Sequence, residues 1–244
     1  MYTIEGLKTE KEKRGFTARK HLAMAALVMF WSAVLVASSF ARDWHELGEM
    51  PQVELLKQIQ VFENRLESEP GNMELLKALG IAYHALAQEN QETFAPKSKA
   101  YLDRAFELDR RDYEVMCYLG SITCMMARTT FNPIKKMSFS NEGLALMDKA
   151  VTREPNNVSV LMVRGLTQAR LPAFFKRKEI AISDFEKVEG ILGTQQDGPD
   201  TKQDVTPTLR KVYTQLSDLY LETGRKDQAD TYMKKQAYLS DGRN

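Results

Sequence analysis

Hydrophobic residues recur at helical spacing along most of the chain, and the stretch 144–166 shows this pattern most clearly. Leu144, Met147 and Val151 lie three and four residues apart, which places them on one face of a helix. Pro155 ends that helix, and the two asparagines that follow it favour a turn and the start of a second helix. Two helices joined by so short a turn must pack antiparallel. One such pair cannot bury its apolar faces alone, so further copies are expected.

The same helix pair recurs four times, with a small residue at the equivalent point of each copy: Gly80, Gly120, Gly165 and Ser217. The first copy reads Leu76-x2-Leu79-Gly80-x2-Tyr83. The pattern resembles the 34-residue unit of the tetratricopeptide repeat (TPR) family, W-x2-L-G-x2-Y followed by A-x3-F and P. In that family the small residue lets the two helices of a pair approach closely.

The resemblance covers residues 53–240 and implies an all-α, TPR-like solenoid of helical hairpins. We expect about four degenerate repeats, preceded by a half-repeat at residues 53–69 that caps the first hairpin. The apolar stripe of this cap comprises Leu55, Leu56, Ile59, Phe62 and Leu66.

The repeats are longer than the family unit of about 34 residues, and the extra residues fall at 89–95, 129–140, 171–177 and 193–205. The second and third of these segments carry aromatic and basic side chains. Insertions in repeat proteins map to loops, often on the binding face, so we expect loops there. Packing against the solenoid as additional cover is the alternative.

Residues 22–41 contain no charged side chain and are long enough for a helix that crosses the hydrocarbon core of a bilayer. The basic residues before them predict a cytoplasmic N-terminus and an extracytoplasmic, periplasmic C-terminal domain in a single-pass cell-membrane protein. A cleaved signal peptide, which would release the domain to the periplasm, remains the alternative because Ser39-Phe40-Ala41 fits a cleavage site. The predicted organisation is a basic tail at 1–21, a transmembrane helix at 22–41, a linker at 42–52, the solenoid at 53–240 and a tail at 241–244.

Charge and motifs narrow the function classes. The 34 lysines and arginines nearly balance the 33 aspartates and glutamates, which argues against a nucleic-acid surface. No zinc, phosphate-binding or nucleophile motif is found, so we expect no catalytic, metal or cofactor site and no enzyme activity. Cys117 and Cys124 lie seven residues apart on one expected helix, about 10 Å along its axis, which is too far for a disulfide.

In TPR proteins the first helices of successive repeats line a concave groove. The resemblance therefore implies groove positions that include Cys117, Ser121 and Cys124, and it contributes six residues to the candidate partner-binding set: Lys77, Ile81, Met125, Met162, Leu166 and Arg170.

The third repeat breaks the pattern. Arg164 occupies the position that Leu79 and Leu119 hold, and burying it requires a carboxylate partner, Asp148 or Asp184. An insertion with two aromatics and two cations follows, and aromatic and arginine side chains are enriched in interface hot spots. The third repeat therefore adds four candidate partner-binding residues: Arg164, Phe174, Phe175 and Arg177.

These observations favour a membrane-tethered, extracytoplasmic scaffold that binds a protein or peptide partner in a bacterial envelope complex. The alternative is an exported accessory protein that binds a ligand in a pocket closed by the insertions. Self-association of the solenoid is left open.

Overall fold

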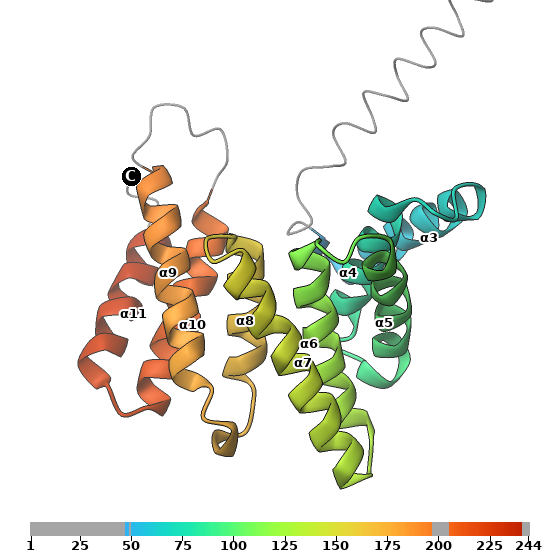
Figure 1. Cartoon of the computed structure of the whole chain (residues 1–244). Coiled ribbons are helices and arrows are strands. Elements are labelled where there is room, and N and C mark those ends of the chain that lie inside the picture. The colour runs from blue at the N-terminus through green and yellow to red at the C-terminus, as the bar shows by residue number, and fades with distance from the viewer. Residues whose placement is uncertain (1–46, 49, 197–204, 241–244) are drawn as a thin grey trace, which may run out of the picture. The chain divides into compact units, whose positions relative to one another are not determined.

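The computed structural model describes residues 47–48, 50–196 and 205–240 (Figure 1). Within these ranges the chain forms nine α-helices and one 3-10 helix, and no strand. They are α3 (Gln52–Ser68), α4 (Met73–Leu86), α5 (Gln91–Leu108), α6 (Tyr113–Thr129), α7 (Pro133–Arg153), α8 (Val158–Ala169), η1 (Ala173–Phe175), α9 (Lys178–Gln196), α10 (Thr206–Glu222) and α11 (Lys226–Ser240). The expected all-α fold is confirmed for this part of the chain.

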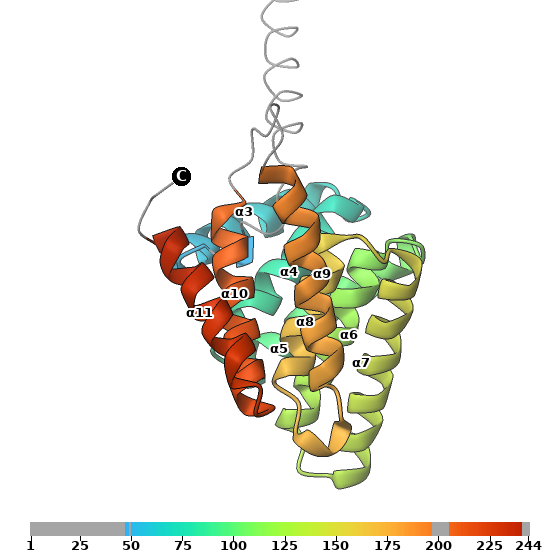
Figure 2. The same cartoon turned by 90° about the vertical axis from the view of Figure 1, so that its left-hand side faces the viewer.

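The helices pair into four antiparallel hairpins, α4–α5, α6–α7, α8–α9 and α10–α11, and α3 packs on α4 (Figures 1 and 2). The first helix of each hairpin also contacts the first helix of the next, so that α4, α6, α8 and α10 follow one another. We call these four the inner helices. The expected order of repeats and N-terminal half-repeat is therefore confirmed.

Side-chain caps start most of the hairpin helices. Asn72, Asp112 and Asn157 accept a hydrogen bond from the backbone N–H three residues later, at the starts of α4, α6 and α8. Such a cap satisfies one of the N–H groups that a helix start leaves without an intrahelical partner. These three inner helices consequently begin at equivalent points of their repeats, whereas α10 starts after Val205 without a side-chain cap.

The small residues at the centre of each pair act as the sequence predicts. A Cβ on Gly80 would lie 2.6 Å from Leu102 Cγ, and a Cβ on Gly120 would lie 2.6 Å from the carbonyl oxygen of Gly143. A Cβ on Gly165 would lie 3.0 Å from the ring of Phe185, and Ser217 is buried. Close approach of the two helices therefore depends on these positions.

Three sequence expectations need correction. The insertion at 89–95 is mostly helix, because Asn90 caps α5 and the helix begins at Gln91. Leu56 does not belong to the buried stripe of α3, because its side chain is 43% exposed while Leu55, Ile59, Phe62 and Leu66 are buried. The segment 129–140 is not a loop, since α7 begins at Pro133 and most of the extra residues lengthen that helix. A proline in the first turn and an Asn132 cap are favourable helix-start signals, which explains the difference.

The insertion at 171–177 is a loop with one 3-10 turn, as expected. The predicted transmembrane segment 22–41, the basic tail 1–21, most of the linker 42–52 and the tail 241–244 lie outside the described residues. No helix in the described ranges is long and apolar enough to cross a bilayer.

Candidate functional site

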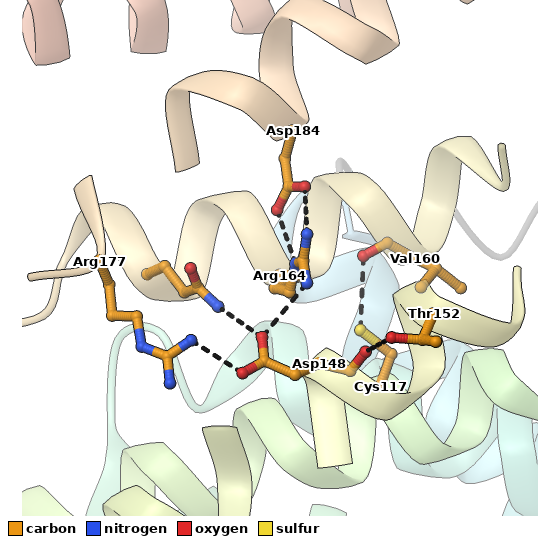
Figure 3. Close-up of polar contacts among 8 residues, drawn as sticks. Cys117, Asp148, Thr152, Val160, Arg164, Arg177 and Asp184 are labelled. Atoms are coloured by element: carbon orange, nitrogen blue, oxygen red, sulfur yellow. Dashed lines mark hydrogen bonds and ion pairs between the residues drawn. The ribbon is translucent and has the colours of Figure 1, made fainter. Parts of the chain in front are cut away.

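An ion network occupies the point where the third repeat departs from the pattern (Figure 3). Arg164 of α8 donates through Nε and Nη2 to the two carboxylate oxygens of Asp184 at 2.8 and 2.6 Å, and through Nη1 to Asp148 at 3.2 Å. Asp184 is only 3% exposed, so the paired guanidinium offsets the cost of burying its charge. The expected carboxylate partners of Arg164 are confirmed.

The same network ties the loop 171–177 to α7. Arg177 Nη1 lies 2.8 Å from the second carboxylate oxygen of Asp148, as Figure 3 shows. Gln168 is fully buried and donates weakly to Asp148 at 3.4 Å, and its Oε1 has no hydrogen-bond partner within the described residues. Arg177 therefore holds the loop in place, a structural role that the sequence does not indicate.

Three sets of polar contacts connect the inner helices across repeats. The first set lies near the helix starts: Lys77 Nζ of α4 is 2.9 Å from Asp112 and 2.7 Å from Glu114 of the next repeat. Glu114 also accepts a hydrogen bond from Ser159 of α8. The two carboxylates raise the pKa of the Lys77 amine despite its burial.

The second set lies further along the helices, with His84 in the last turn of α4. His84 Nε2 is 2.8 Å from Ser121 Oγ, and Ser121 Oγ is 2.7 Å from Thr167 Oγ1, so one chain of contacts joins α4, α6 and α8. The His84 ring also packs edge-on against Tyr118, with 5.1 Å between ring centroids. Burial, together with the nearby charge of Arg170, lowers the pKa of His84 to about 4, so the imidazole is neutral at pH 7.

The third set lies at the ends of the inner helices. Gln88, which follows α4, contacts Met125 of α6 and accepts a hydrogen bond from Arg170 at the end of α8. Burial and the charge of Arg128 on α6 lower the pKa of Arg170. Two exposed arginines from neighbouring repeats, Arg128 and Arg170, are thus near enough for their charges to interact, and we call this pair the arginine edge.

The proximity of these two arginines can be predicted by comparing equivalent positions in successive repeats. Gln88 and Arg128 each lie eight residues after the central glycine of their repeats, Gly80 and Gly120. Met125 and Arg170 each lie five residues after Gly120 and Gly165. The contact of Gln88 with Met125 therefore has its equivalent one repeat later in Arg128 beside Arg170.

The candidate partner-binding residues divide by exposure. Ile81 is 1% exposed and Met162 3%, and Met125 and Lys77 are also buried. A side chain covered by its own neighbours cannot be reached by a partner without rearrangement, so we assign these four to packing between the inner helices. Cys117 and Cys124 also depart from the expected groove: both are buried free thiols, directed at the carbonyls of Val160 and Ser140.

Arg164 and Arg177 belong to the ion network, and the remaining candidates lie in the last turn of α8 or in the loop that follows it. Arg170 is exposed and Leu166 partly exposed. Phe174 is 68% exposed and its ring centroid is 4.4 Å from that of Phe175. Lys176 follows in the left-handed backbone conformation, with φ of 54°, where it ends the 3-10 turn. These residues could meet a partner directly.

No cluster of three or more histidine, cysteine or acidic side chains that could hold a metal ion occurs in the described ranges. The network of Arg164 satisfies its own charges, and the His84 chain is closed by hydroxyl groups.

Known proteins were compared with the chain by sequence and by structure. Neither the family models nor the curated protein sequences match it. Among solved structures, a thermophilic TPR protein of Thermus thermophilus, TTC0263, aligns over 78% of this chain and 88% of its own, with a TM-score of 0.56 and 16% identity. MamA AMB-1 covers 78% of this chain and 92% of its own at 17% identity, with a TM-score of 0.48. A further crystal structure of MamA covers 75% and 87% at 19% identity, with the same score.

The similarity to TTC0263 concerns the fold, since the two sequences share 16% of their residues. It agrees with the hairpin order, the central small residues and the contacts between successive inner helices. The described part of the chain therefore has a TPR-like helical repeat fold.

Proposed function

We propose that this protein is an interaction scaffold that binds a protein or peptide partner at the arginine edge of its inner helices. The observation that carries the proposal is the pair of exposed arginines Arg128 and Arg170, from consecutive repeats, which are near enough for the charge of Arg128 to lower the pKa of Arg170. The exposed Phe174 lies in the loop that follows α8. Arginine and aromatic side chains dominate the binding energy of many protein interfaces.

The partner segment should carry an acidic group. Two neighbouring guanidinium groups repel one another, and each residue between Arg164 and Lys178 is neutral or basic. A carboxylate placed between the arginines would relieve the repulsion and form charge-assisted hydrogen bonds, which are the strong ones. The three sets of contacts between inner helices keep this edge preorganised, which reduces the entropy cost of binding.

The scaffold is further proposed to be tethered to a bacterial cell membrane by residues 22–41 and to display its repeats outside the cytoplasm, as part of an envelope complex. The support is the uncharged run with basic residues before it. Protease added to intact spheroplasts should digest residues 53–240, and carbonate should not extract the protein. Complete protection from protease would refute this topology, and release of a soluble chain starting near Arg42 would favour a cleaved signal peptide.

A charge-reversal experiment tests the binding edge. The full chain and the double variant Arg128→Glu/Arg170→Glu are purified from cells after mild crosslinking, and the bound proteins are quantified. We expect a partner at constant stoichiometry with the native chain and a loss of at least about tenfold with the variant, because two favourable charge contacts become repulsive.

Lys149→Glu is the matched control, since Lys149 is exposed on the outer helix α7 and the charge change is of the same kind. It should capture the partner normally. Equal capture by all three proteins would refute the arginine edge. Melting that depends on a small molecule, without any partner, would instead favour the exported ligand-binding protein.

A further inference from the structure

The turn between α6 and α7 exposes large apolar side chains that the proposed scaffold function does not use. We call residues 130–139 the α6–α7 tip. Phe131 is 103% exposed, Ile134 80% and Met137 45%. Side chains of these types are most often buried in folded proteins, and a cluster of them on the surface marks an interaction site more often than single exposures do.

Local structure presents two of these side chains on α7 and the third just before it. Ile134 and Met137 lie three residues apart in the first turns of α7, which places them on one face, and Phe131 precedes the N-cap Asn132. The Asn132 side chain accepts hydrogen bonds from the backbone N–H groups of Ile134 and Lys135 at 2.9 and 3.1 Å. The apolar residues are therefore presented by a capped helix end.

All charged side chains of the tip are basic. Residues 129–141 contain Lys135 and Lys136 and no aspartate or glutamate. Both lysines are exposed, and neither forms an ion pair within the part of the chain that the structure describes. Lysine in the first turn of a helix opposes the helix dipole, so helix stability does not account for this pair. A basic turn of this kind attracts an anionic surface.

The shape of the tip favours a lipid surface over a folded protein. In both Figures 1 and 2 the α6–α7 turn lies at the lower end of the hairpins, on the same side as η1. A protein partner would need a matching hollow for three apolar side chains, whereas a bilayer interface closes around any such projection. Apolar side chains with lysines around them are the composition of segments that lie in the headgroup region.

We propose that the α6–α7 tip docks on a bilayer that contains anionic phospholipid. Phe131, Ile134 and Met137 enter the boundary between headgroups and acyl chains, and Lys135 and Lys136 contact lipid phosphates. This contact uses neither residues 22–41 nor the two arginines of the arginine edge, although Arg128 lies two residues before the tip. It would hold the repeats in a defined orientation against the membrane.

The test places a fluorophore on the tip of the full chain. Phe131→Cys is labelled with the environment-sensitive dye NBD, and the protein is reconstituted in nanodiscs of phosphatidylcholine alone or with phosphatidylglycerol. The native cysteines Cys117 and Cys124 are buried, so labelling of the folded protein selects the new thiol. We expect NBD emission to shift to the blue, and to be quenched by lipids with a shallow spin label, only in the anionic discs.

Leu108→Cys is the matched control, because Leu108 is an exposed apolar residue (55%) at the end of α5, outside the tip. The emission of its NBD label should be that of a water-exposed dye in both kinds of disc. Adding Lys135→Glu/Lys136→Glu to the Phe131→Cys protein should abolish the shift, and salt should weaken it.

Three results would overturn the proposal. The first is NBD at position 131 that stays in water in anionic discs. The second is an equal shift in neutral discs, which would remove the role of the lysines. The third is a shift without lipid that grows with protein concentration, which would assign the tip to a second copy of the chain.

Discussion

Arg164 shows how one residue can depart from a repeat pattern and still support the fold. Its position is held by leucine in the neighbouring repeats, and here a guanidinium lies between Asp148 and Asp184. A buried ion pair adds little net stability compared with apolar packing. Once the pair is present, however, removal of one partner leaves the other charge buried, and the repeat depends on both.

Arg164→Ala should therefore destabilise the domain by about 3 kcal/mol at pH 7. Burial raises the pKa of Asp184, and loss of the guanidinium should raise it further. A carboxyl whose pKa is raised in the folded state stabilises most when protonated, and this stability is lost as pH rises through the folded pKa. The loss in free energy of unfolding that Arg164→Ala causes should therefore be smaller at pH 5 than at pH 7.

Chemical denaturation at both pH values measures this effect. The double variant Arg164→Ala/Asp184→Asn is the control, because it removes the charge that Arg164→Ala leaves behind. It should be more stable than the single variant at pH 7. Its loss of stability relative to the native protein should also change less between the two pH values. A single variant as stable as the native chain would mean that the network carries no structural role.

At the scale of elements, the close approach of α6 to α7 depends on glycine. A Cβ on Gly120 would lie 2.6 Å from the carbonyl oxygen of Gly143, and a carbonyl on a packed helix cannot swing aside as a side-chain end can. Gly120→Ala should therefore separate the two helices and cost about 1–3 kcal/mol. For a domain of this size that corresponds to a fall in Tm of about 2–4 °C per kcal/mol.

Gly190→Ala supplies the matched control for this substitution. Gly190 lies within α9, and a Cβ there would meet no atom within 4 Å. Alanine has the higher helix propensity, so this variant should gain up to about 1 kcal/mol. Thermal unfolding followed by circular dichroism compares the two, and equal Tm values would contradict the packing account.

Much of this fold can be predicted from sequence because each hairpin repeats the same physical requirements. The central small residue, the large residues around it and the polar caps before α4, α6 and α8 indicate the helix pairs and their order. Asn132-Pro133 is an equally clear helix-start signal, whereas the extra length of the repeat alone predicts a loop at 129–140. Leu56 fits the apolar spacing and is nevertheless exposed, since a cap helix packs on only one side.

The candidate site was less predictable. Positions taken from the family's groove include Ile81 and Met162, which the structure buries between neighbouring inner helices. The spacing of residues within one helix indicates on which face of the helix each residue lies. The exposure of that residue, however, depends on how closely the next repeat packs. The pairing of Arg128 with Arg170 requires the offset between repeats, which the contact of Gln88 with Met125 supplies.

For the whole molecule, the described residues form a single row of hairpins with inner helices connected across repeats. Most contacts join neighbouring repeats, and Arg170 of the third repeat also reaches Gln88 of the first. The proposed contact is the arginine edge, whose two arginines are exposed, as is Phe174 in the loop after α8. The central claim is that a partner protein binds there.

Site-specific photocrosslinking tests this claim most directly. The photoreactive residue benzoylphenylalanine replaces Phe174 in one full-length protein and Lys149, on the outer helix α7, in another, and each is irradiated in living cells. We predict one dominant crosslinked partner at position 174 and none at position 149. Crosslinks of equal pattern and strength at both positions, or none at position 174, would contradict the account.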